Sequence, residues 1–93
     1  MQKKTIYSEA YRQLVDRLRE RREGLGQTQT ALAKILGWPQ QKLSAVETGS
    51  RRLDVMEYFS LTHALGFSRQ EALALVPEEP LRRSRKSSAG RRA

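Results

Sequence analysis

The polar side chains that could do chemistry lie close together near the middle of the chain. Gln40, Gln41 and Ser44 precede a loop that contains Arg51 and Arg52. A glutamine amide can bond both N6 and N7 of adenine, a serine hydroxyl can donate or accept, and arginines can bind phosphate. If this stretch is helical, Gln41 and Ser44 face away from its apolar side. These side chains could therefore contact a nucleic acid, or they could be solvated surface residues.

Other kinds of chemistry lack the residues that they need. The sequence has no Cys, which excludes disulfides, Cys-ligated zinc, iron–sulfur clusters and thiol catalysis. His63 is the single His, with no carboxylate pair at ligand spacing, so a helix-surface role is expected for it. No nucleophilic dyad or phosphate-binding Gly loop is present. We therefore predict that the protein is not an enzyme and uses no metal and no cofactor.

The charge balance favours an anionic partner. Lys and Arg number 18 and Asp and Glu number 10 among 93 residues, for a formal net charge of +8. Half of this excess lies in residues 77–93, and residues 1–76 carry the other half. A basic tail on an unrelated domain would explain only the first half. A small domain that is basic in its own right is a candidate for binding nucleic acid.

Residues 77–93 differ in composition from the rest of the chain. Their sequence, PEEPLRRSRKSSAGRRA, has one Leu as its only large apolar residue. Such a stretch cannot bury enough surface to offset its ordering entropy, so we predict a disordered basic tail after a single domain at 1–76. No apolar run approaches the roughly 20 residues of a membrane span, and the start MQKKTIYSEA lacks the apolar core of a secretory signal. We therefore expect a cytoplasmic protein without a membrane partner.

Apolar residues recur at helical spacing through the predicted domain. Tyr11, Leu14, Val15 and Leu18 fall at i, i+3, i+4 and i+7, and no run alternates with period two. Ser and Thr N-caps, capping boxes and closing glycines indicate where the segments begin and end. The predicted helices cover about residues 8–23, 29–36, 39–47, 54–65 and 68–76. The predicted fold class is all-α, with five short helices.

The second and third predicted helices are too short to be stable alone, so they must pack on each other. Gly37 lies between them, where a left-handed residue permits a sharp turn. The small side chain of Ala33 lets the next helix cross closely, and Leu43 and Val46 then point back at Leu32. This is the steric requirement of a helix-turn-helix unit.

Residues 29–49, QTALAKILGWPQQKLSAVETG, resemble the helix-turn-helix domains of phage repressors, Cro proteins and the related XRE-type bacterial regulators. That family has Gln, Ala and Gly at the first, fifth and ninth positions of the unit. It has apolar residues at the fourth, eighth, fifteenth and eighteenth positions, and it ends in E-x-G. The matching residues here are Gln29, Ala33 and Gly37, then Leu32, Leu36, Leu43 and Val46, and finally Glu47 and Gly49. The remaining helices fit the family's five-helix, lambda-repressor-like layout, so the resemblance covers about residues 8–76.

The resemblance implies that the helix at 39–47 enters the DNA major groove. Base contacts are expected from Gln40, Gln41, Ser44 and Ala45. Contacts to the DNA backbone are expected from Thr28, Gln29, Lys42, Arg51 and Arg52. Thr28 could also be only an N-cap, and the two arginines could form a solvated loop. Arg22 and Glu47 match a partly buried salt bridge of the family and are assigned to structure first, and Arg22 could also reach phosphate.

Two residues depart from the family's pattern. Trp38 stands in the turn, where small or polar capping residues are common, and it either walls off the turn or stacks on sugar-phosphate. The structural role is the favoured one. Gln27 replaces a Leu that is usual at its position, which predicts less apolar packing at that corner.

The main functional hypothesis is a sequence-specific transcriptional regulator of a prokaryote or phage, associated with the nucleoid. It would be a repressor that binds a palindromic operator as a homodimer. Leu73, Leu75 and Val76 of the last helix are the expected dimer contact, although they could instead pack on the first helix. The alternative is an antitoxin that binds a toxin protein, through the tail for example, and represses its own operon. An RNA-binding protein would need exposed stacking aromatics, for which Trp38 and Tyr58 are the candidates.

Overall fold

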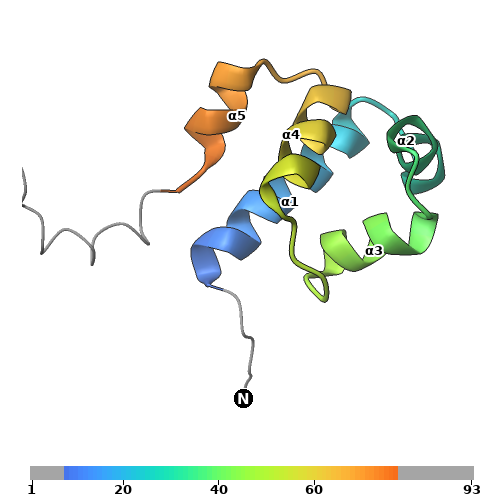
Figure 1. Ribbon diagram of the computed structural model, residues 1–93, viewed down its shortest axis with the longest axis horizontal. Coiled ribbons are helices and arrows are strands. Elements are labelled where there is room, and N and C mark those ends of the chain that lie inside the picture. The colour runs from blue at the N-terminus through green and yellow to red at the C-terminus, as the bar shows by residue number, and fades with distance from the viewer. Residues whose placement is uncertain (1–7, 78–93) are drawn as a thin grey trace, which may run out of the picture.

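The computed structural model describes residues 8–77, and all of its regular elements are helices (Figure 1). They are α1 (Glu9–Gly24), α2 (Gln29–Leu36), α3 (Gln40–Thr48), α4 (Val55–Ala64) and α5 (Arg69–Leu75). No strand occurs in this part of the chain, so the predicted all-α fold with five helices is confirmed. The tail is predicted to be disordered, and its residues beyond Pro77 lie outside the described range.

Side-chain caps set where four of the helices begin. Ser8 and Thr28 each accept a hydrogen bond of 3.0 Å from the backbone N–H three residues on. Asp54 and Ser68 form capping boxes, in which a Glu three residues on bonds back to the backbone of the cap. The expected helix starts at 8, 39, 54 and 68 are N-caps, so these helices begin one residue later.

One apolar core draws side chains from every helix. Its buried members are Leu14, Leu18, Leu32, Ala33, Leu43, Tyr58, Leu61, Leu65 and Ala72. Because helices of 7 to 10 residues are not stable alone, α2 to α5 depend on this shared core. Figure 1 shows α2 and α3 on one side of α4 and α5 on the other. No helix in the described range is both long enough and apolar enough to cross a bilayer.

Candidate nucleic-acid interface

The turn between α2 and α3 has the geometry that the helix-turn-helix prediction requires. Gly37 caps α2 with φ of +74°, a conformation that residues with a side chain rarely adopt. The next residue, Trp38, donates its backbone N–H to the Ala33 carbonyl at 2.9 Å, which closes the turn. Ala33 is 2% exposed and Leu43 of α3 is fully buried, so the two helices cross closely. The predicted helix-turn-helix at α2 and α3 is therefore confirmed.

The helix α3 is buried on one face and more exposed on the other. Leu43 and Val46 are buried, with exposed fractions of 0% and 1%, and they anchor the helix to the core. Gln40 and Gln41 are exposed at the start of the helix, and Ser44 is half-buried one turn further on. Ala45, the fourth predicted base-contacting residue, is half-buried too. Of the four side chains expected to contact bases, the two glutamines are thus exposed, and Ser44 and Ala45 are partly shielded.

A chain of hydrogen bonds fixes the first of these side chains. Gln40 donates its Nε2 hydrogen to Oε1 of Gln29 at 2.9 Å, and Gln29 donates its own Nε2 hydrogen to Oε1 of Glu47 at 2.9 Å. The start of α2 is therefore tied to both ends of α3. The Gln40 amide keeps its oxygen and its second hydrogen for another partner. This link does not follow from the sequence, whose one local signal for it is a Gln at the start of each helix.

The chain of bonds ends in a buried ion pair. Arg22 of α1 donates from Nε and Nη2 to the two oxygens of Glu47, at 2.7 and 2.9 Å. Its Nη1 donates to the Gln27 carbonyl at 2.7 Å. The side-chain hydrogen bonding of Arg22 to the Glu47 carboxylate is the main cause that raises the pKa of Arg22 above its ordinary value. This bidentate pair joins the end of α1 to α3.

The predicted backbone-contacting residues fall into two groups. Thr28 is exposed and caps α2 through its hydroxyl, and it shares the start of that helix with Gln29. Arg52 is exposed, and its guanidinium lies 5.1 Å from the centre of the Tyr11 ring. Lys42 and Arg51 are instead both engaged by one carboxylate of α4 and are taken up separately below.

The two aromatic candidates for stacking have structural roles. Trp38 is half-buried and packs against the core, with the Lys42 ammonium 4.3 Å from its ring centre. Tyr58 is 8% exposed, and its hydroxyl donates to the Ala72 carbonyl at 2.7 Å. Burial raises the pKa of the Tyr58 hydroxyl. Tyr58 is therefore not the exposed stacking aromatic that the RNA-binding alternative requires.

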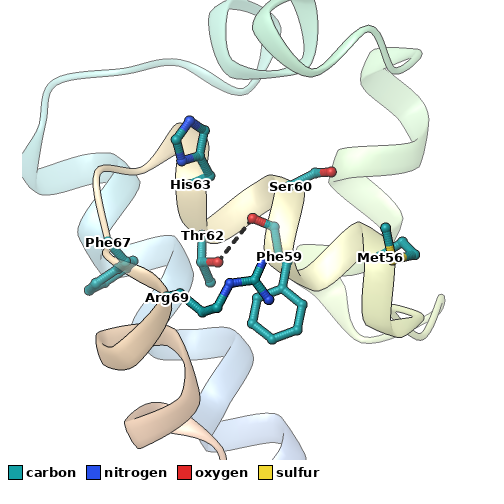
Figure 2. A pocket seen from close by; sticks show the side chains of 7 residues that line it. All are labelled: Met56, Phe59, Ser60, Thr62, His63, Phe67 and Arg69. Carbon is teal, nitrogen blue, oxygen red and sulfur yellow. Dashed lines mark hydrogen bonds between the residues drawn. The ribbon is translucent and has the colours of Figure 1, made fainter.

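The single histidine lies away from α3. Figure 2 shows His63 at the edge of a hollow of about 330 Å³ on α4, in which the Arg69 guanidinium lies 4.8 Å from the Phe59 ring centre. The side chains around the hollow are Met56, Phe59, Ser60, Thr62, His63, Phe67 and Arg69. No group of three or more His, Cys, Asp or Glu that could hold a metal occurs within residues 8–77.

Comparison with known proteins agrees with this geometry. The sequence model of a family described as a helix-turn-helix domain matches residues 13–75. The match contains α2 to α5 whole and most of α1. Neither a curated protein nor a solved structure matches the chain.

Proposed function

Since the chain belongs to the helix-turn-helix domain family, whose fold binds DNA, we propose that it is a transcriptional repressor that occupies a palindromic operator as a homodimer. Domains of this family are typically not enzymes. The observation that carries the proposal is the exposed polar face of α3, which is anchored to the core on its other side. The cytoplasmic location and the antitoxin alternative stay predictions, and the tail expected to bind a toxin lies outside the described residues.

The base contacts are assigned to the exposed face of α3. Gln41 is exposed, and a Gln amide matches the donor and acceptor pattern of adenine in the major groove. Gln40 presents an amide whose orientation is already set by Gln29, which reduces the side-chain entropy lost on binding. Ser44 and Ala45 follow one turn later, where a hydroxyl can bond a base edge and a methyl group can contact thymine.

Backbone contacts are assigned to the start of α2 and to the loop after α3. Thr28 and Gln29 lie where the free N–H groups of a helix favour phosphate. Arg52 is an exposed residue of the loop that follows α3. These contacts would hold α3 in register over the base edges.

An exposed apolar surface on α4 and α5 supports the dimer. Leu73 and Val76 are 56% and 46% exposed, and Val55 at the start of α4 is 68% exposed. All three line a hollow of about 400 Å³ between α1, α4 and α5. Leu75, the third residue expected at the dimer contact, packs against the core instead. A second copy that uses the same surface would form a two-fold dimer, which suits half-sites about 34 Å apart.

Selection of bound fragments from a random pool of double-stranded DNA tests the proposal. At about physiological salt, which suppresses sequence-independent binding, we expect an inverted repeat. Gln41→Ala should weaken binding to that site by about 1–3 kcal/mol and spare binding to scrambled DNA. Gln13→Ala, at an exposed glutamine of α1, is the matched control. Equal losses on both DNA sequences would remove Gln41 from base recognition, and recovery of no motif would contradict the proposed function.

The dimer has a test of its own. Leu73→Glu places a charge in the exposed apolar surface without touching the core, so the fold should persist. Sedimentation velocity should show the wild type as a dimer on the selected site and the variant as a monomer with weaker binding. A variant that still binds the site two to one would exclude this surface as the interface.

A further inference from the structure

One carboxylate of α4 engages two cations, one within the candidate DNA-reading helix α3 and one in the loop after it. Oε2 of Glu57 lies 2.9 Å from the Lys42 ammonium and 2.9 Å from Nη2 of Arg51. Its other oxygen, Oε1, accepts the Asp54 backbone N–H at 3.0 Å as part of the capping box. Lys42 belongs to α3 and Arg51 to the loop after it. A single negative charge is therefore shared by both cations, and it holds them toward α4.

The carboxylate that the two cations share is partly shielded from solvent. The side chain of Glu57 is 14% exposed, that of Lys42 24% and that of Arg51 47%. The backbone hydrogen bond from Asp54, followed by the one from Lys42, lowers the pKa of Glu57 from 4.5 to about 2. The carboxylate is thus ionised at any pH at which the protein would meet DNA. The Lys42 ammonium is further held over the Trp38 ring, 4.3 Å from its centre.

A phosphate that approaches either cation must compete with this carboxylate. Coulomb attraction between a cation and a partly shielded carboxylate is stronger than between fully solvated charges, so the competition is not negligible. Glu57 thus engages two of the cations that were expected to contact the DNA backbone.

We propose that Glu57 is an internal counter-ion that withholds Lys42 and Arg51 from the DNA backbone and so lowers the sequence-independent affinity for DNA. The inference rests on the proposed DNA-binding function. It assigns to Glu57 a role in binding that is separate from its role as a helix cap. A Gln at this position can keep the cap, because Gln also serves in capping boxes, but it removes the charge.

The salt dependence of binding measures the number of phosphate contacts. Each additional contact steepens the slope of log affinity against log salt by about 0.9, so a rise from about 50 to about 200 mM salt costs roughly 3.5-fold more affinity per contact. If Glu57→Gln releases both cations, the affinity of the variant for DNA should fall about 12-fold more than that of the wild type over this salt range. If it releases one cation, the additional fall should be about 3.5-fold. At the low-salt end, the variant should bind scrambled DNA more tightly than the wild type does.

The test is fluorescence anisotropy of the full chain on a short duplex of scrambled sequence, across that salt range. Glu71→Gln is the matched control, because Glu71 fills the same position in the capping box of α5 but forms no ion pair within residues 8–77. The control should keep the wild-type slope. A slope for Glu57→Gln that equals the wild-type slope, or a weaker affinity at low salt, would overturn the proposal and leave Glu57 with a purely structural role.

A second variant keeps the proposal testable if Glu57→Gln fails to fold. In Lys42→Gln/Arg51→Gln the carboxylate remains, and the slope should fall by less than about 0.9, because both cations are largely withheld already. A fall of about 1.8, the value for two full contacts, would overturn the proposal. Absence of any binding by the wild type, even at the lowest salt, would instead contradict the proposed function, so the two failures are distinguishable.

Discussion

The substitution Glu47→Gln is expected to remove a large share of the stability, because it leaves the Arg22 guanidinium buried without its counter-charge. Arg22 and Glu47 are 8% and 9% exposed. Breaking a buried pair from one side costs about 3–5 kcal/mol. We expect about 3 kcal/mol, since Arg22 keeps its bond to the Gln27 carbonyl. At about 0.05–0.15 kcal/mol per residue, the roughly 70 described residues have a free energy of unfolding of roughly 4–10 kcal/mol.

Urea denaturation followed by circular dichroism measures this loss as a lower midpoint with an unchanged slope. The matched control is Glu23→Gln, which removes a second carboxylate that faces the same arginine. Glu23 lies 3.7 Å from Nη2 of Arg22, and its side chain is 59% exposed. Solvent screens such a pair, so the control should change the free energy of unfolding by less than about 1 kcal/mol.

Two results would refute this reasoning about burial. The first is a loss for Glu47→Gln below about 1 kcal/mol, the range of an exposed pair. The second is an equal loss for Glu47→Gln and Glu23→Gln. The double variant Arg22→Met/Glu47→Leu adds a further check, because replacing both buried charges by apolar groups should recover most of the stability. The Gln29 amide would lose its acceptor in that variant, so recovery should stay incomplete.

Three further predictions concern stability and use the same urea assay. Gln27→Leu should raise the free energy of unfolding by about 1 kcal/mol, because Oε1 of Gln27 is buried without a hydrogen-bond partner; a loss would show that the amide is satisfied. Gly37→Ala should lower the free energy of unfolding by about 1–2 kcal/mol, because φ at Gly37 is +74°. Gly24→Ala, at a helical position with open space, should raise it slightly. Equal effects of the two substitutions would exclude backbone strain as the cause. The pKa of Glu57 falls from 4.5 to about 2 on folding, so its contribution to the free energy of unfolding is fully present above about pH 4.5 and is lost as the pH falls toward 2. Glu57→Gln should therefore flatten the dependence of stability on pH in that window. An unchanged dependence would contradict the pairing of Glu57 with the two cations.

Much of the fold follows from interactions between residues close in sequence. Ser8, Asp54 and Ser68 cap helices through bonds to residues three positions on, so their side chains mark helix starts without knowledge of the tertiary structure. The Gly37 turn is also local, because only its own backbone conformation and the small Ala33 beside the crossing are needed. For this reason the five helices and the helix-turn-helix unit could be predicted from the sequence.

The sequence predicts which residues belong to the candidate site, but it does not predict which of them bond to one another. The exposed positions of Gln40 and Gln41 follow from the helical period of α3. The Gln29–Gln40 bond and the sharing of Glu57 by two cations do not, because they join residues whose spacing along the chain sets no distance between them. The sequence therefore offers no reason to separate Lys42 and Arg51 from the other basic residues.

The sequence by itself determined the helices, their caps, the turn and the basic charge, because each depends on local conformation or on composition alone. The tertiary structure decided which side chains in α5 and at its C-cap remain exposed: Leu75 packs against the core, while Leu73 and Val76 face solvent. It also decided which cations are engaged by a carboxylate. The physical reason is that burial and ion pairing depend on how the helices cross, and crossing is set by the packing of all five helices together.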